Sequence, residues 1–357
     1  MNQQNKTYKV LGIMSGTSLD GIDLCLTEFK RIKDDWSYQI QATRIQKYSE
    51  EWEKELTNIE SKSAVDFVEL DFRYGKYLGE VAHKFLSEKE ESVDAIASHG
   101  HTIFHQIKRG FTYQLGNGAS IAAASKTVCV SDFRSLDVAL GGQGAPLVPF
   151  GDEKLFGSYN ACINLGGIAN VSFHKEGERI AFDVCPCNMV SNYFMRKFHQ
   201  SEYDKDGELS RSGKLIPELY QALNEVAFFK TVGPKSLGKE WIFETIIPLM
   251  EKHQQTSADL LFTYSKHIAF QIANTLKSNN IHSNILFTGG GSKNKFLVEL
   301  LKAEGLEFEL PKEQIIDFKE ALIFAFLGLN RILSENNTLK SVTGARKNSC
   351  GGSIYLP

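Results

Sequence analysis

One succession of elements occurs twice along the chain, and it limits the accessible folds more than any other feature. In the first copy, strands are predicted over 8–14, 22–29 and 37–48, with a glycine-bearing turn after the first strand and a helix over 64–86. In the second copy, strand, glycine turn and strand cover 161–174, a third strand covers 179–185 and a helix covers 187–199. We therefore predict two similar α/β domains with mixed sheets around a central cleft.

Length and composition agree with this division. The chain has 357 residues, of which 42% are hydrophobic and 23% charged, as in ordinary globular proteins. We place an N-terminal domain at 1–135 and a C-terminal domain at 136–317. The strongly apolar helix predicted over 318–333 and the Gly- and Ser-rich tail after it, about 318–357 in all, are expected to fold back and complete the first domain.

Charge and hydropathy exclude several classes of partner. The net charge is −3 and no dense block of Lys and Arg occurs, so binding to nucleic acid or to an anionic membrane is not expected. No apolar run reaches the about 18 residues of a membrane span, and the polar start lacks the apolar core of a signal peptide. These features predict a cytoplasmic protein. The six scattered cysteines are interpreted as reduced, small apolar side chains.

Three glycine-rich turns, over 15–21, 166–172 and 289–292, each follow a predicted strand. Glycine lets the backbone approach a ligand closely and present successive N–H groups to an anion, although a single turn of this kind can equally be a plain hairpin. No Walker or G-x-G-x-x-G pattern is present. The candidate phosphate-binding residues are Ser15, Gly16, Thr17, Ser18, Asp20, Gly21 and Asp23 around the first turn, Gly166, Gly167 and Asn170 around the second, and Gly289, Gly290, Gly291 and Asn294 around the third.

The three turns in this order resemble the superfamily of actin, hexokinase and the sugar kinases. The resemblance implies actin/hexokinase-like (ribonuclease H-like) domains, with ATP and Mg²⁺ as cofactors. Members often carry an Asp two residues before the first Gly-Thr as an acid of the metal site, and this chain has Met14 there. The magnesium ligand is then expected to be another acid, with Asp20 or Asp183, acting through water, as the candidates.

A narrower resemblance covers nearly the whole chain. The segments GIMSGTSLDGID (12–23), SHGHTIFH (98–105), GGQGAPLVP (141–149), INLGGIANVS (163–172) and FTGGGSKN (287–294) are similar to those of the 1,6-anhydro-N-acetylmuramic acid kinases. The resemblance implies that water opens the 1,6-anhydro bridge of the sugar while the freed O6 takes the γ-phosphoryl group of ATP. The products are N-acetylmuramic acid 6-phosphate and ADP, in recycling of the cell wall. It also makes a homodimer an expectation.

Two other functions stay open at this point. One is a kinase of the same fold that acts on a different sugar or amino sugar. The other is an actin-like nucleotide-binding protein without sugar chemistry, which is disfavoured because it would give no role to Asp183, Arg134 or the GGQGAP string.

Asp183, at the end of the strand IAFD, is the predicted catalytic base for the attacking water. The alternative is that this Asp caps the helix that follows. The family often reads DTGPGN where this chain has DVCPCN, so we expect altered packing around a retained base and a change in activity or substrate preference.

The remaining candidates are expected to contact the sugar. Arg134 offers a planar fork suited to the lactyl carboxylate, although a salt bridge would explain it equally. Glu320 begins the EALIFA motif and is either a sugar contact or a helix start. His99, with the nearby His101 and His105, is interpreted as polar lining rather than as a metal ligand. The substrate-binding set is His99, Arg134, Asp137, Asn188 and Glu320.

Overall fold

The computed structural model describes residues 6–16, 19, 21–33, 35–231 and 233–357. They form two compact units, one made of Met1–Phe156 and Phe318–Pro357 and the other of Gly157–Asp317. We call them unit 1 and unit 2. Each has its own sheet and its own apolar core.

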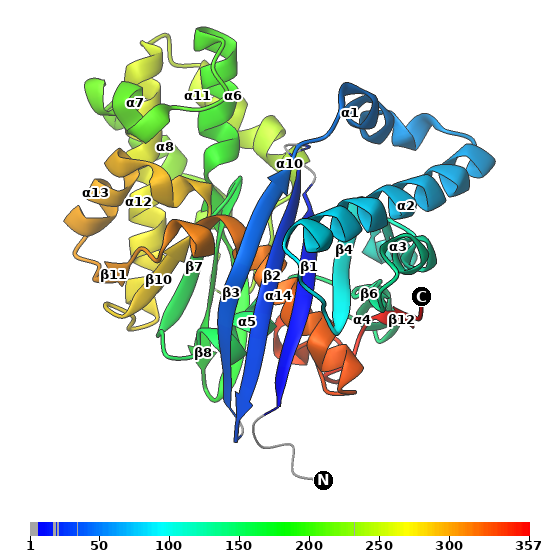
Figure 1. Ribbon diagram of the computed structural model, residues 1–357. Coiled ribbons are helices and arrows are strands. Elements are labelled where there is room, and N and C mark those ends of the chain that lie inside the picture. The colour runs from blue at the N-terminus through cyan, green and yellow to red at the C-terminus, as the bar shows by residue number, and fades with distance from the viewer. Residues whose placement is uncertain (1–5, 17–18, 20, 34, 232) are drawn as a thin grey trace. The chain divides into compact units, whose positions relative to one another are not determined.

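Unit 1 is built on the long strands seen in blue in Figure 1. Its strands are β1 (Thr7–Ser15), β2 (Ile22–Ile32), β3 (Asp35–Gln46), β4 (Ala95–Gln106), β5 (Phe111–Leu115), β6 (Cys129–Ser131) and β12 (Ser353–Tyr355). The sheet order is β12-β6-β4-β1-β2-β3, with β5 paired to β4. Strands β1, β2 and β3 are antiparallel, whereas β4 runs parallel to β1 and β6 parallel to β4.

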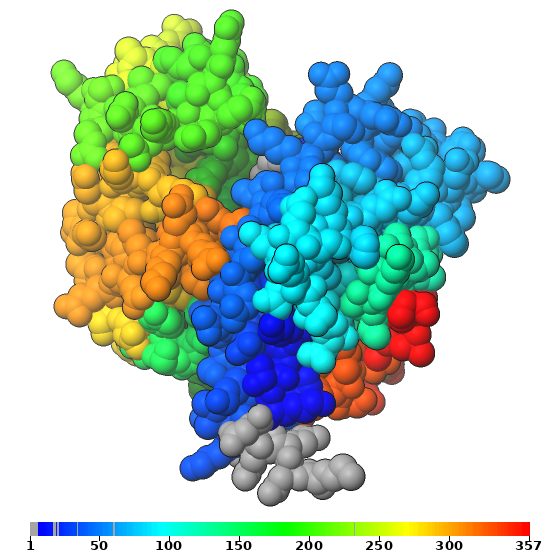
Figure 2. All heavy atoms as spheres, in the orientation of Figure 1, coloured from blue at the N-terminus to red at the C-terminus, as the bar shows by residue number. Residues whose placement is uncertain are grey.

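The helices of unit 1 cover this sheet. They are α1 (Glu50–Thr57), η1 (Ile59–Ser61), α2 (Ala64–Glu88), η2 (Ile107–Arg109), α3 (Gly118–Ser125), α4 (Ser135–Ala139), α5 (Val148–Leu155), most of α14 (Glu313–Ile332) and α15 (Lys340–Thr343). Helix α2 buries Leu70, Tyr74 and Leu78, which are four residues apart and therefore lie on one face. The surface of α1 and α2, blue to cyan in Figure 2, forms one end of the unit.

Unit 2 repeats the sheet on a smaller scale. Its strands are β7 (Ala161–Leu165), β8 (Ile168–Lys175), β9 (Glu178–Pro186), β10 (Ile285–Thr288) and β11 (Phe308–Glu309), in the order β11-β10-β7-β8-β9. Its helices are α6 (Asn188–His199), η3 (Lys205–Gly207), α7 (Glu208–Ser212), α8 (Pro217–Glu225), α9 (Ala227–Lys230), α10 (Lys239–Trp241), η4 (Ile242–Ile246), α11 (Ile247–Glu251), α12 (Ser257–Ser278), η5 (Gly290–Lys293) and α13 (Lys295–Ala303).

The two sheets share one topology. In unit 2, β7, β8 and β9 are antiparallel, β10 runs parallel to β7, and β11 runs parallel to β10. This matches β1, β2, β3, β4 and β6 of unit 1 strand for strand. The predicted fold class, two similar α/β halves with mixed sheets of the ribonuclease H-like type, is confirmed.

Helix α14 packs against the sheet of unit 1, and most of its residues from Phe318 to Asn330 are buried. Its Phe326 ring lies 5.4 Å from the rings of both Phe29 and Trp36, measured between centroids. The helix approaches β1 so closely that a Cβ atom on Gly12 would lie 1.9 Å from the carbonyl oxygen of Ala321. Only a residue without a side chain fits there.

Residues 136–156 belong to unit 1, so the boundary expected at 135/136 lies too early. The reason is the packing of α5 on α14. The Phe150 ring stacks on Phe326 at 5.8 Å, and the buried carboxylate of Asp152 lies 2.6 Å from the ammonium of Lys319. These contacts join segments that are far apart in the chain, so the local composition of either segment does not predict them.

Two further features of the fold are the state of the cysteines and the apolarity of the helices. All six cysteines are unpaired, and five of them are buried. Among the described helices, none combines the length and the apolarity that a bilayer crossing requires.

The Gly12 contact can be tested by substitution. We expect Gly12→Ala to destabilise unit 1 by about 2–3 kcal/mol, because the added methyl group forces α14 away from β1. The measurement is the urea midpoint followed by circular dichroism. Gly167→Ala is the matched control, since its Cβ would meet nothing closer than 3.5 Å. Equal midpoints for the two variants would contradict the close packing.

Candidate active site

The first glycine turn begins where β1 ends, at Ser15. The Ser15 hydroxyl is buried and lies 2.7 Å from the Tyr48 hydroxyl and 2.6 Å from that of Tyr74, and these two tyrosine oxygens are 2.6 Å apart. This closed set of hydroxyls gives Ser15 protein partners instead of the phosphate oxygens expected for it. Its geometry favours a role in holding the turn.

The rest of this turn is described only in part. Thr17, Ser18 and Asp20 lie outside the described residues. Gly21 is buried with φ of +146°, and a Cβ there would lie 2.8 Å from the Gln46 carbonyl oxygen, so the turn needs glycine at this point. Gly16, at the start of the same turn, is half-buried.

Asp23 pairs with Met14 across β1 and β2. Directly paired residues of neighbouring strands place their side chains on the same face of a sheet. The half-buried Asp23 carboxylate therefore lies on the same face as the Met14 side chain, which occupies the position where an acid is expected from the superfamily resemblance.

In unit 2 the equivalent positions form a polar row. Asn164 on β7 pairs with Asn170 on β8, and Asn170 pairs with Asp183 on β9. The three side chains lie on one face and are all half-buried. Within the part of the chain that the structure describes, neither amide of the row has a hydrogen-bond partner in the protein.

A β-bulge presents Asp183 on this face. Ala169 pairs with Cys185 and Asn170 with Asp183, so Val184 is an extra residue in β9. Val184 and Cys185 are both directed into the core, where their exposed fractions are 1% and 0%. The carboxylate of Asp183 is left on the open face.

The segment after α9 holds Asp183 in place. The Asp183 N–H donates to the Lys235 carbonyl oxygen at 2.9 Å, and the Leu237 N–H donates to Asp183 Oδ2 at 2.8 Å. Burial raises the pKa of Asp183 above its ordinary 3.8, and the Leu237 hydrogen bond opposes this shift. Among the described residues, no donor bonds to Oδ1. The N-cap of α6 is Cys187, with no side-chain cap hydrogen bond, so Asp183 does not cap the helix that follows. This favours the interpretation of Asp183 as a base.

Two glycine turns of unit 2 lie against the polar row. A Cβ on Gly289, where φ is +82°, would lie 2.4 Å from Asn164 Oδ1, so the third turn touches the first residue of the row. Asn188, at the start of α6, donates its amide to the Leu165 carbonyl oxygen at 2.9 Å. Its own N–H donates to Gly166. Asn188 therefore ties the second turn to α6 rather than presenting its amide to a sugar.

The two cysteines of DVCPCN do not face the row. Cys185 and Cys187 are fully buried within the unit 2 core, near Tyr264, whose hydroxyl donates to the Pro186 carbonyl oxygen at 2.8 Å. The bulk that replaces glycine in the family pattern is thus taken up by the core.

Asn294 caps a helix. Its Oδ1 accepts the Leu297 N–H at 3.0 Å, which makes it the N-cap of α13. Gly290 and Gly167 are exposed, whereas Gly291 is buried against Leu165 and Asn188. The exposed glycine backbones are the part of these turns that a phosphate can reach.

In unit 1, Arg134 and His99 form the most connected pair. Arg134 donates from Nε and Nη2 to His99 Nε2, at 3.0 and 2.8 Å, and from Nη1 to the Gly144 carbonyl oxygen at 2.7 Å. Burial lowers the pKa of Arg134 to about 10, while Glu320 and Asp137 oppose the shift. A guanidinium at this pKa remains charged at neutral pH.

Asp137 is not placed to contact a sugar. Its side chain is fully buried, with Oδ2 accepting the Gly144 N–H at 2.8 Å and Oδ1 accepting the Thr343 hydroxyl at 2.7 Å. It fastens the GGQG segment to the C-terminal tail. The expected sugar contact is replaced by a structural one, because both carboxylate oxygens already have buried donors.

Glu320 lies in the first turn of the unit 1 part of α14, next to Lys319. Its side chain is exposed, yet protein surrounds it closely enough to raise the pKa of the carboxyl, while Arg134 and Lys319 act to lower it. It is the acid whose charge acts most on Arg134. It therefore remains available to a ligand.

The histidines of β4 have separate partners. His99 is bonded to Gly100 and Arg134, and His105 Nδ1 lies 3.3 Å from the Thr112 hydroxyl. Among the described residues, no three His, Cys, Asp or Glu side chains come together as a metal site would require.

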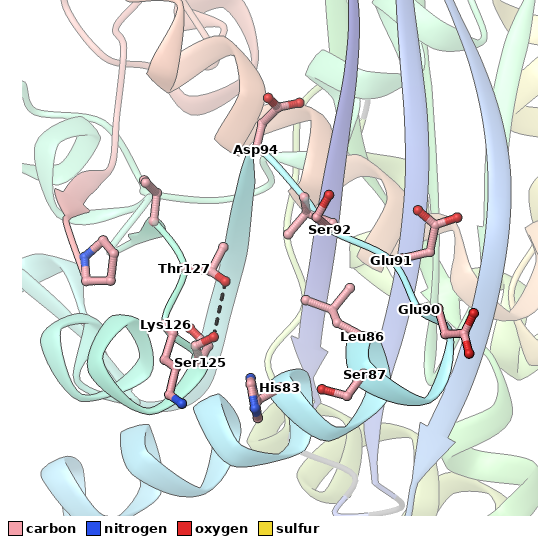
Figure 3. Close-up of a pocket in the computed structure, with 13 residues that line it drawn as sticks. His83, Leu86, Ser87, Glu90, Glu91, Ser92, Asp94, Ser125, Lys126 and Thr127 are labelled. Carbon is pink, nitrogen blue, oxygen red and sulfur yellow. Dashed lines mark hydrogen bonds between the residues drawn. The ribbon is translucent and has the colours of Figure 1, made fainter.

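A groove of about 610 Å³ in unit 1 lies elsewhere, between the end of α2 and the start of β6 (Figure 3). Two of the three acids that line it are already engaged. Glu91 pairs with the Lys9 ammonium at 2.6 Å, and Asp94 accepts the Lys9 N–H at 2.8 Å. No predicted site residue lines this groove, so we assign it no function.

Comparison with known proteins identifies the family. The model of the family "Anhydro-N-acetylmuramic acid kinase" matches residues 8–357. A protein of that name from Sulfurimonas denitrificans is 34% identical, over 97% of this chain and 98% of its own. One from Sulfurovum sp. is 34% identical over 98% and 99%. One from Hydrogenovibrio crunogenus is 30% identical over 100% of both.

This chain belongs to the anhydro-N-acetylmuramic acid kinase family. The class of activity predicted from the sequence, an ATP-dependent sugar kinase, is confirmed. The non-enzymatic actin-like hypothesis is excluded by the same finding.

Asn164 is a candidate site residue that the sequence analysis did not name. The strand ACINL is apolar except for this residue, which stands two positions before the Gly-Gly pair. That is the same offset as Met14 from the first turn. Comparing the two turns position by position could have identified it.

Asn294 offers a test of the cap against the nucleotide contact predicted for it. Asn294→Ala should lower the free energy of unfolding by about 1 kcal/mol, because Leu297 loses its acceptor, and should leave the KM for ATP unchanged. Asn294→Ser, which keeps a capping oxygen, is the control and should restore stability. A rise in KM with unchanged stability would instead assign Asn294 to the nucleotide.

Proposed function

We propose that this chain opens the anhydro ring of 1,6-anhydro-N-acetylmuramic acid with water and phosphorylates O6 from ATP, with Asp183 as the base. The observation that carries this is the open face of unit 2, where a carboxylate with one unengaged oxygen lies in a row with two unpartnered amides. Oxygen and amide groups at strand ends, bordered by glycine turns, suit a water and a phosphoryl group.

The proposed reaction transfers one proton, from the attacking water to Asp183. Asp183 Oδ1 takes a proton from water as the water oxygen bonds to C1 of the sugar. The C1–O6 bond breaks, O6 bonds to the γ-phosphorus, and ADP leaves. Burial raises the pKa of Asp183, which makes its carboxylate a stronger base than that of an ordinary Asp.

The phosphates of ATP fit the glycine turns. Exposed backbone at Gly167 and Gly290 supplies N–H donors, and the amides of Asn164 and Asn170 add polar groups beside Asp183. Asp183, Asn164 and Asn170 also offer the carboxylate and amide oxygens that would hold Mg²⁺ through water. Bound there, Mg²⁺ would neutralise charge on the phosphates.

Unit 1 is proposed to recognise the sugar. Arg134 keeps N–H groups beyond those given to His99 and Gly144, and a guanidinium fork matches a carboxylate such as the lactyl group. The exposed Glu320 can accept from a sugar hydroxyl. We place the enzyme in the cytoplasm, which agrees with its need for ATP and with its unpaired cysteines.

The test of the overall function is a coupled assay for ADP. Release of ADP that depends on 1,6-anhydro-N-acetylmuramic acid supports the function. Release that occurs only with a different sugar would establish the alternative kinase, which the family comparison does not favour.

The base can be tested by Asp183→Asn. We expect turnover to fall by a factor of about 10²–10⁴, because the amide cannot take the proton of water, while ADP binding measured by calorimetry is retained. Glu178→Gln, at the exposed opposite end of β9, is the control. Turnover near that of the wild type would remove Asp183 as the base.

The pH profile gives a second measurement. A base must be deprotonated, so kcat should rise with pH through the pKa of Asp183 and then level off. Since burial raises that pKa above 3.8, the acidic limb should lie above the range of an ordinary Asp.

Asn164 can be tested by Asn164→Leu, which keeps the branching and the number of side-chain heavy atoms and removes the amide. We expect kcat/KM for ATP to fall by about tenfold to a hundredfold, because a hydrogen bond to a charged group contributes about 1.5–3 kcal/mol. Asn160→Leu, just before the start of β7, is the matched control. Equal kcat/KM for the two variants would exclude a contact between Asn164 and the nucleotide.

A further inference from the structure

The imidazole of His99 has both nitrogens engaged. It is buried on β4, and Nδ1 lies 2.8 Å from the Gly100 carbonyl oxygen. A carbonyl oxygen only accepts, so Nδ1 carries the hydrogen. In the neutral ring this leaves Nε2 as a bare acceptor, and it is Nε2 that receives the two Arg134 N–H groups.

The Gly100 carbonyl is held in this position by its own backbone. Gly100 has φ of +75°, and a Cβ there would lie 2.6 Å from the Leu115 carbonyl oxygen. Any other residue would therefore disturb the strand pairing. The acceptor that fixes the tautomer of His99 is thus built into the sheet.

Arg134 has N–H groups that remain available for a ligand. Of its five N–H groups, three are used, by His99 twice and by Gly144 once. Among the described residues no further acceptor bonds to it, so one N–H on each terminal nitrogen remains. Such a pair matches the two oxygens of a carboxylate.

The charges around His99 require the neutral ring. Arg134 is the cation in contact with it, His101 is a second ionisable neighbour, and Glu320 acts on Arg134 from α14. From the same helix the apolar ring of Phe324 covers the imidazole at 4.6 Å. Burial and then Arg134 lower the pKa of His99 well below 6.5.

We infer that His99 is a positioning residue that makes the enzyme selective for an anionic sugar, by acting as a fixed neutral acceptor that orients the guanidinium of Arg134. This rests on the proposed function, in which Arg134 binds the lactyl carboxylate. His99 does not touch the sugar, and the substrate contact expected for it from the sequence becomes an indirect one.

The alternative roles of His99 are incompatible with this geometry. A metal ligand needs a free nitrogen lone pair, and the lone pair of Nε2 points at Arg134. A general base would need that same lone pair. The Arg134 cation and the buried ring also disfavour a protonated general acid.

The experiment compares two sugars on the full chain. 1,6-Anhydro-N-acetylmuramic acid carries the lactyl carboxylate, and 1,6-anhydro-N-acetylglucosamine is the same ring without it. The measured quantity is the ratio of kcat/KM for the anionic sugar to that for the neutral one. Variants are His99→Leu, which removes the acceptor, His99→Gln, whose amide oxygen can replace Nε2, and Arg134→Met as the reference. Thermal melts check folding.

We expect His99→Leu to lower this ratio by about tenfold or more, toward the value of Arg134→Met, and His99→Gln to restore most of it. A wild-type ratio in His99→Leu, with the ratio lost in Arg134→Met, would overturn the role of His99 and leave that of Arg134 intact. A wild-type ratio in Arg134→Met would overturn both roles. Sugar-dependent ADP release in that variant would still establish the kinase.

A pH series separates positioning from packing. Above its pKa His99 accepts from Arg134, and below it the protonated ring repels the guanidinium. The ratio should therefore stay constant as pH falls through 6.5 and decline only at lower pH, because the pKa of His99 is lowered. His99→Gln should lack this additional decline. Titration of Asp183 cancels, since both sugars use the same base, and identical profiles for wild type and His99→Gln would contradict the inference.

Discussion

The approach of α14 to β1 is the constraint on which unit 1 depends. The contact of the helix backbone at Ala321 with Gly12 restricts the position of the neighbouring helix residues. Those residues include Lys319, which forms the buried ion pair with Asp152, and Phe324, which packs on His99. Helix α14, from near the end of the chain, therefore fixes the orientation of Arg134 through His99.

The two sheets carry different side chains in the corresponding row. Met14, Asp23 and Ile45 of unit 1 are paired across β1, β2 and β3 as Asn164, Asn170 and Asp183 are across β7, β8 and β9. The first row has one acid between two apolar side chains. The second has an acid and two amides.

Much of the fold could be predicted from the sequence, because strand alternation, glycine turns and helical spacing are local. The repeat gave the two units, and the apolar segment around Phe326 indicated a core helix. What was missed depends on contacts between distant segments. The place of α5 in unit 1 follows from α14, and short elements such as β5 have little pattern of their own.

The sequence predicted the roles of the site residues less well than it predicted the fold. The family motifs led to Arg134 and Asp183, because the implied reaction needs a base for water and a partner for the lactyl carboxylate. They could not separate ligand contacts from structural ones, since the residue types are the same. Asp137 and Asn294 became a buried anchor and a helix cap only when their partners, Thr343 and Leu297, were visible.

The bulge at Val184 has a consequence for how this strand can change in evolution. Side chains of a strand alternate between faces, and the extra residue shifts that alternation by one step within β9. Substitutions at 184 alter only the core volume. Loss of one residue there would exchange the two faces, sending either a carboxylate into the core or a buried cysteine into the solvent. The length of this segment therefore constrains the position of Asp183 more than the identity of the residue at 184 does.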